Sequence, residues 1–233
     1  MWWLVEIIRE TKPKMILWEN VPGCLAADMR RNYKKFITAL NTVGYHTYAK
    51  ILNAKDFGVP QHRDRVFVLA IRKDIEINFE MPRGYDSGIR IRDILESDVS
   101  ESYTINNDTV RKMLKSTFHQ TQRKIHNINK HCFTICARTD PPYVRITAGK
   151  VRKFTAKECF RLMGFSDDDF YKCKGAGVSD AQLYKQAGNS IVVNVLMAIF
   201  GELYGVEWQH QVYGNFYKTE QQRINELPLL QAA

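Results

Sequence analysis

A short unbroken apolar run, Met15-Ile16-Leu17-Trp18, constrains the fold of this chain more than any other feature of its sequence. Such a run is typical of a parallel strand that is buried on both faces of a sheet. Apolar residues recur at helical spacing before the run, at Leu4, Ile7 and Ile8, and after it, at Met29, Tyr33, Phe36, Ile37 and Leu40. Strands are expected near residues 45–52 and 65–71. This order, with a strand, a helix and two further strands, indicates the end of a doubly wound α/β sheet.

The second half of the chain differs from the first in polarity and charge. Past Arg72 the sequence is polar and basic, until the pattern Thr155-Ala156-Lys157-Glu158 predicts a capped helix that ends at Gly164. Ser179-Asp180-Ala181-Gln182 predicts the start of another helix in the same way. Residues 190–203 are nearly all apolar, so we expect a buried helix there.

The formal net charge of +9 comes from one segment. Between Arg111 and Lys153 there are eleven Lys or Arg and a single acid, a local net charge of +10, which leaves −1 for all other residues. A run of charge is most often a solvated face, and this alternative stays open. The segment also holds His, Asn and Gln side chains, which can contact phosphates and base edges and so favour a polyanion as partner. The candidate contacts are Arg111, Lys112, Lys115, Arg123, Lys124, Lys130 and Arg138.

Composition narrows the class of protein further. No apolar run approaches the roughly 20 residues that a membrane span requires, and five irregularly spaced cysteines do not suggest a disulfide framework. We therefore expect a cytoplasmic protein with free thiols and no membrane partner. His131, Cys132 and Cys136 invite a zinc site, but in an alternating strand the two cysteines would stand about 13 Å apart, so no metal is expected.

Three short segments carry a family resemblance. They are Glu19-Asn20-Val21, Gln61-His62-Arg63-Asp64-Arg65 and Gly188-Asn189-Ser190, and residues 151–165 match a further motif. Together they resemble the DNA (cytosine-5) methyltransferase family over residues 1–82 and about 145–208. The resemblance implies the C-terminal portion of a Rossmann-like, S-adenosylmethionine-dependent large domain over residues 1–80. It also implies a smaller DNA-recognition domain over 81–186 and a returning helix with a polar tail over 187–233.

The resemblance also implies a role for each matching residue. Glu19 would bind N3 of a flipped cytosine and help to protonate it, and a carboxyl at the mouth of an apolar strand, being partly desolvated, suits that task. Arg63 and Arg65 stand two apart at the start of a strand, so both are expected on one face, where they would steady the catalytic loop and the target nucleotide. Asn189 and Ser190 would lie beside S-adenosylmethionine, at a helix amino end that favours an anion. The basic segment would then contact double-stranded DNA.

Two hallmarks of the family do not occur in the sequence, namely a Pro-Cys dipeptide and a Gly-rich cofactor loop. The resemblance implies a cytosine methyltransferase of a bacterial or phage-type restriction–modification system, associated with the nucleoid. Alone, this chain is expected to be inactive and to need a complementing N-terminal polypeptide. The alternative is a non-catalytic DNA-binding or regulatory remnant of such an enzyme, which would keep only the recognition domain.

Overall fold

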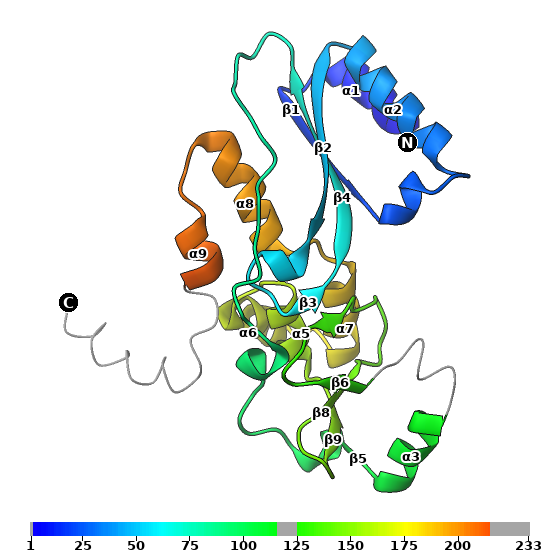
Figure 1. Ribbon diagram of the computed structural model, residues 1–233, viewed down its shortest axis with the longest axis vertical. Helices are drawn as coiled ribbons and strands as arrows, with labels where there is room; N and C mark the ends of the chain where they lie inside the picture. Colours follow the sequence, from blue (N-terminus) through cyan, green and yellow to red (C-terminus); the bar gives the residue numbers. More distant parts are fainter. Residues whose placement is uncertain (1, 116–124, 215–233) are drawn as a thin grey trace, which may run out of the picture. The chain divides into compact units, whose positions relative to one another are not determined.

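The computed structural model describes residues 2–115 and 125–214, apart from the side chains of Asn107, Arg111, Met113 and Leu114 (Figure 1). The chain packs into two units. The first unit comprises residues 2–53, Asp64–Gly84 and Ile199–Val206, and the second comprises the remaining described residues. Each unit is made of several separate segments of the chain. The division therefore does not test the domain boundaries expected at residues 80 and 186, which stay predictions.

The first unit is built on a three-stranded sheet. Its strands are β1 (Met15–Asn20), β4 (Asp64–Arg72) and β2 (Tyr45–Asn53), in the order β1-β4-β2. The prediction of a parallel, fully buried strand at residues 15–18 was wrong, because β1 pairs antiparallel with β4 and every residue of β1 keeps some exposure. β1 forms an edge of this sheet, whereas the central β4 is buried from Val66 to Ile71.

Two helices cover one face of this sheet (Figure 1). They are α1 (Trp2–Thr11) and α2 (Arg30–Thr42), close to the predicted positions, and a short 3₁₀ turn, η1 (Pro22–Leu25), precedes α2. Their apolar sides meet the sheet in a core formed by Val5, Ile8, Phe36, Leu40, Tyr45 and Ala70. A second cluster joins Cys24 of η1 to Val66 and Val68 of β4, with Trp18 and Tyr33 packed against it.

The second unit contains short strands that no sequence pattern predicted. A four-stranded sheet has the order β5 (Thr104–Ile105), β9 (Val151–Lys153), β8 (Tyr143–Arg145) and β6 (Ile125–Asn127). A separate parallel pair joins β3 (Gln61–His62) to β7 (Cys132–Phe133). Helix α3 (Asn107–Lys115) and the 3₁₀ turns η2 (Ala54–Asp56), η3 (Ile91–Ile94) and η4 (Glu101–Tyr103) complete this part.

Helices dominate the rest of the described residues. They are α5 (Ala156–Leu162), α6 (Asp167–Gly175), α7 (Asp180–Asn189), α8 (Val193–Tyr204) and α9 (Gln209–Gly214). The predicted capping box is confirmed, since Thr155 accepts from Glu158 N–H and Glu158 accepts from Thr155 N–H. Gly164 follows the helix at a φ of +80°, a conformation that glycine adopts without strain. The helix expected from Ser190 begins three residues later.

Residues Asp180–Tyr204 form the one helical stretch of the described chain that is long and apolar enough, by composition, to cross a membrane. About half of its most apolar window is buried in the protein. The extended backbone of Ser190 divides the stretch into α7 and α8, each shorter than the roughly 20 residues of a span. The length and apolar composition of this stretch are also those of core helices in soluble proteins.

Candidate active site

Glu19 and Arg65 form an ion pair in the first unit. Glu19 lies near the carboxyl end of β1, and Arg65 lies near the start of β4, which runs antiparallel beside it. Nε of Arg65 is 2.8 Å from Oε1 of Glu19, and the two side chains are 16% and 21% exposed. Arg65 also donates through Nη1 to the carbonyl of Asp64 at 2.7 Å. The arginine therefore orients a carboxylate that solvent, and so a ligand, can still reach.

Arg63 lies in the second unit, where its guanidinium is buried among backbone carbonyls. Nη1 donates to Ile135 at 3.0 Å, and Nη2 donates to Gly188 at 3.2 Å and to Ser190 at 3.1 Å. Two of these carbonyls are at the carboxyl end of α7, where the negative end of the helix dipole favours a cation. Arg63 thus ties the end of α7 to the Ile135 segment.

The expectation that the two arginines share one face assumed a single strand through both. β4 begins at Asp64, so strand alternation does not extend back to Arg63. Each arginine instead has its own partners, a carboxylate for Arg65 and carbonyls for Arg63. The structure brings Glu19 together with Arg65, and Arg63 together with Ser190.

Gly188-Asn189-Ser190 lies at the carboxyl end of helix α7, and the predicted place at a helix amino end was wrong. Ser190 is the C-cap, with extended backbone, and α8 begins only at Val193. The N–H of Ser190 donates to the carbonyls of Gln186 and Ala187, and its hydroxyl donates to Ala187 at 2.8 Å. These donors are therefore engaged within the helix end and do not form the expected anion site.

The glycine of this segment permits a close approach. A Cβ at Gly188 would lie 2.2 Å from the carbonyl carbon of Cys136, so only glycine fits without a shift of the backbone. Asn189 is exposed, whereas Ser190 is partly buried. Of the two residues expected beside the cofactor, only Asn189 presents an exposed side chain.

The residues of the basic segment are only partly described. Lys112 and Lys115 are exposed on α3, and Lys130 and Arg138 are exposed on either side of β7. Arg111 belongs to α3, but its side chain is not described, and Arg123 and Lys124 lie outside the described residues. Among the polar residues that interleave with the cations, His126 is buried at 7% exposure against Phe133 and Phe154, so it does not face a ligand.

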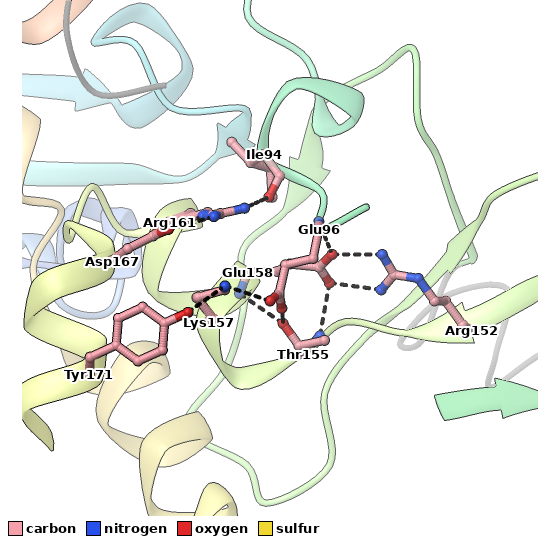
Figure 2. Close-up of polar contacts among 9 residues, drawn as sticks. All are labelled: Ile94, Glu96, Arg152, Thr155, Lys157, Glu158, Arg161, Asp167 and Tyr171. Atoms are coloured by element: carbon pink, nitrogen blue, oxygen red, sulfur yellow. Dashed lines mark hydrogen bonds and ion pairs between the residues drawn. The ribbon is translucent and has the colours of Figure 1, made fainter. Parts of the chain in front are cut away.

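A buried polar network surrounds the start of helix α5 (Figure 2). Both oxygens of Glu158 accept from Arg152, at 2.6 and 2.8 Å, although the two side chains are 0% and 5% exposed. The same carboxylate accepts from the N–H groups of Thr155 and Glu96. Four donors on one buried carboxylate compensate for its loss of water. The capping pattern pointed to Glu158, but nothing in the sequence pointed to Arg152.

The network extends along α5 through two further cations. Lys157 pairs with Glu96 at 2.6 Å and donates to Tyr171 at 3.0 Å. Burial acts to lower the pKa of Lys157, but these hydrogen bonds outweigh it and raise the pKa above its ordinary value. Arg161 holds Asp167 with two contacts of 2.7 Å and donates to a backbone carbonyl of η3. α5 is therefore anchored to its surroundings by charged groups, as a scaffold element.

The cysteines do not include an evident nucleophile. Burial raises the pKa of the Cys24, Cys132 and Cys159 thiols, which disfavours the thiolate that attacks carbon. Cys136 is exposed and Cys173 is partly exposed, and neither follows a proline. β7 ends at Phe133, so the strand geometry assumed for the zinc argument does not hold. Within the described ranges, no three His, Cys, Asp or Glu side chains gather as a metal site.

Comparison with known sequences gives one family. Residues 1–205 match the family model described as C-5 cytosine-specific DNA methylase. The type II methyltransferase M2.ScrFI of Lactococcus lactis subsp. cremoris is 34% identical over 215 residues, which cover 88% of this chain and 58% of the relative. M.HhaI of Haemophilus parahaemolyticus is 31% identical over 216 residues, which cover 84% of this chain and 64% of that enzyme. The chain thus spans about three fifths of the length of these relatives.

Comparison with solved structures gives the fold. The S. pombe Dnmt2 methyltransferase superposes with a TM-score of 0.69 at 22% identity, covering 87% of this chain and 71% of that one. The Entamoeba histolytica methyltransferase EhMeth has a TM-score of 0.62 at 21% identity, covering 87% and 68%. The α/β, Rossmann-like methyltransferase fold expected from the sequence is confirmed.

Proposed function

The chain belongs to the C-5 cytosine-specific DNA methylase family, and from this premise we propose that it forms the C-terminal part of an enzyme that methylates C5 of a flipped cytosine in a specific DNA sequence. The observation that carries the proposal is the Glu19–Arg65 ion pair at the carboxyl end of β1. In open α/β sheets this end of a strand is where ligands bind. We place its action in the cytoplasm, on bacterial or phage DNA.

In the proposed mechanism Glu19 acts on N3 of the cytosine. A cysteine thiolate adds to C6, and electron density moves into the ring, where protonation or hydrogen bonding at N3 stabilises it. C5 then becomes nucleophilic enough to accept a methyl group, and loss of the C5 proton with elimination of the cysteine thiolate from C6 restores the ring. Arg65 holds one oxygen of Glu19 at 2.8 Å, which fixes the carboxyl group before the base arrives. S-adenosylmethionine supplies the methyl group when it is bound.

Arg63 and Asn189 take supporting roles in this proposal. Arg63 fixes the carboxyl end of α7 through the carbonyls of Gly188 and Ser190, and this places the exposed amide of Asn189. Asn189 then offers a polar contact at the edge of the cofactor. Arg63 is a positioning residue, because its guanidinium is occupied by backbone carbonyls.

We propose that the attacking cysteine lies outside these 233 residues, in a complementing N-terminal part of the enzyme. Support comes from the chemistry of the five cysteines, since none follows a proline and burial raises the pKa of three of them. β1 also offers a free edge in the described sheet, with apolar residues and unpaired backbone groups along it. Such an edge can accept another strand.

The test is methyl transfer with and without the complementing part. The purified chain is incubated with S-adenosylmethionine labelled in its methyl group and with duplex DNA, alone or with an N-terminal fragment of a relative that carries the Gly-rich loop and the Pro-Cys segment. We expect 5-methyldeoxycytidine only from the combination. Transfer by the chain alone would show that no second polypeptide is needed. A mixture that assembles on DNA without transfer would favour the non-catalytic remnant.

A further inference from the structure

A basic depression lies between α1 and α2 in the first unit. It has a volume of about 720 Å³ and is lined by Trp2, Ala27, Arg30, Arg31, Lys34, Lys35, Thr38 and Ala39. Four of these eight residues are cationic and none is acidic. All four cations are exposed, and they belong to the first two turns of α2.

The four cations have no acidic partner among the residues that the structure describes. Within the described chain, none of the ion pairs includes Arg30, Arg31, Lys34 or Lys35. Arg30 and Lys34 are four residues apart on the helix, as are Arg31 and Lys35, a spacing at which like charges repel. They also stand at the amino end of α2, where the helix dipole disfavours cations and no acid occupies the first turn. An anionic ligand would relieve both penalties.

The depression lies at the Glu19 end of the sheet. Cys24 of η1 and Tyr33 of α2 pack in one cluster with Val66 and Val68 of β4. Val66 pairs with Asn20 and Val68 with Trp18, the residues on either side of Glu19. The first turns of α2 therefore rest on the end of the sheet that carries the candidate catalytic residue, while strand alternation places the side chain of Glu19 on the opposite face from Trp18.

We propose that this depression binds backbone phosphates of the DNA duplex whose cytosine is presented to Glu19. The proposal rests on the proposed function and adds a second DNA surface to it, outside the basic segment at residues 111–153. Arginine and lysine side chains that neutralise phosphates release counterions, and this makes binding sensitive to salt. Trp2, which is 50% exposed, adds a flat apolar wall that suits a sugar or base edge. Phosphate contacts of this kind position a protein without reading sequence.

The experiment measures affinity of the whole 233-residue chain for a fluorescein-labelled duplex across a series of KCl concentrations. The variant Arg31→Gln/Lys35→Gln neutralises two of the four cations, and glutamine keeps a similar helix propensity. The matched control Lys12→Gln/Lys14→Gln removes the same charge at the other end of β1, from two exposed residues. A third variant, Lys130→Gln/Arg138→Gln, removes the same charge from the basic segment.

We expect the slope of log affinity against log salt to become shallower by about 1.8 in Arg31→Gln/Lys35→Gln, since each neutralised phosphate contributes about 0.9. The control should keep the wild-type slope. If Lys130→Gln/Arg138→Gln weakens binding while Arg31→Gln/Lys35→Gln does not, the depression is a solvated helix face and the proposal is wrong, although the proposed function stands. A wild-type chain that binds no duplex overturns both. Charge-dependent binding to vesicles of anionic phospholipid without duplex binding would assign the surface to a membrane instead.

Discussion

The ion pair between Glu19 and Arg65 joins residues that are far apart in the sequence. Each was expected to be catalytic from its own motif, but nothing in the two motifs showed that they touch. The antiparallel pairing of β1 with β4 places them 2.8 Å apart. Because Arg65 orients the carboxyl group of Glu19 before substrate arrives, Glu19 should contribute to the chemical step at N3 of the cytosine and hardly to the binding of DNA.

Glu19→Gln is therefore expected to separate turnover from affinity in the reconstituted enzyme. Glutamine keeps the shape but cannot deliver a full proton to N3, so single-turnover methyl transfer should fall by about 10²–10⁴-fold. Duplex affinity should barely change, because it comes mainly from phosphate contacts. Glu10→Gln, at an exposed position on α1, is the matched control. Wild-type turnover in Glu19→Gln would remove Glu19 from the mechanism.

At the scale of elements, helix α5 depends on a buried ion pair. Glu158→Ala would leave the guanidinium of Arg152, whose side chain is only 5% exposed, without its carboxylate partner. The N–H groups of Thr155 and Glu96 would lose the same acceptor. Breaking one side of a buried pair typically costs about 3–5 kcal/mol, whereas replacing both partners by apolar residues costs much less. Urea unfolding should thus show a larger loss for Glu158→Ala than for the double variant Arg152→Met/Glu158→Leu. An equal or larger loss in the double variant would mean that the pair does not act as a unit.

The elements also show what the sequence could predict. Local patterns were sufficient for α1, α2, β2, β4 and the capping box of α5, because apolar periodicity and capping residues determine such elements locally. They failed for β5 to β9, whose two or three residues are too few for any periodicity. They also failed at Ser190, where the polar cap and the apolar residues after it read as the start of a helix. The bend there depends on contacts that sequence does not reveal, such as the carbonyl of Ser190 bound by Arg63.

For the whole molecule, charge is the property that the sequence predicts best. The segment from Arg111 to Lys153 carries a net charge of +10 and the rest of the chain carries −1, whatever the fold. The sequence could not show how the charged residues outside this segment are arranged in space. In the structure, four cations of α2 gather around one depression. The part of the chain outside the basic segment therefore has a second strongly positive surface, although its net charge is small.

The distribution of charge leads to a prediction for the basic segment itself. Lys112→Glu/Lys115→Glu reverses two exposed charges on α3 and should weaken duplex binding to a similar extent for all sequences, because phosphate contacts carry no sequence information. Wild-type affinity should fall steeply between about 50 and 200 mM salt, and less steeply in the variant. Anisotropy titrations with two unrelated duplexes test this, with Lys12→Glu/Lys14→Glu as the control of equal charge change. A variant that loses affinity for only one of the duplexes would show that α3 reads bases, and an affinity independent of salt would show that the basic segment is a solvated face.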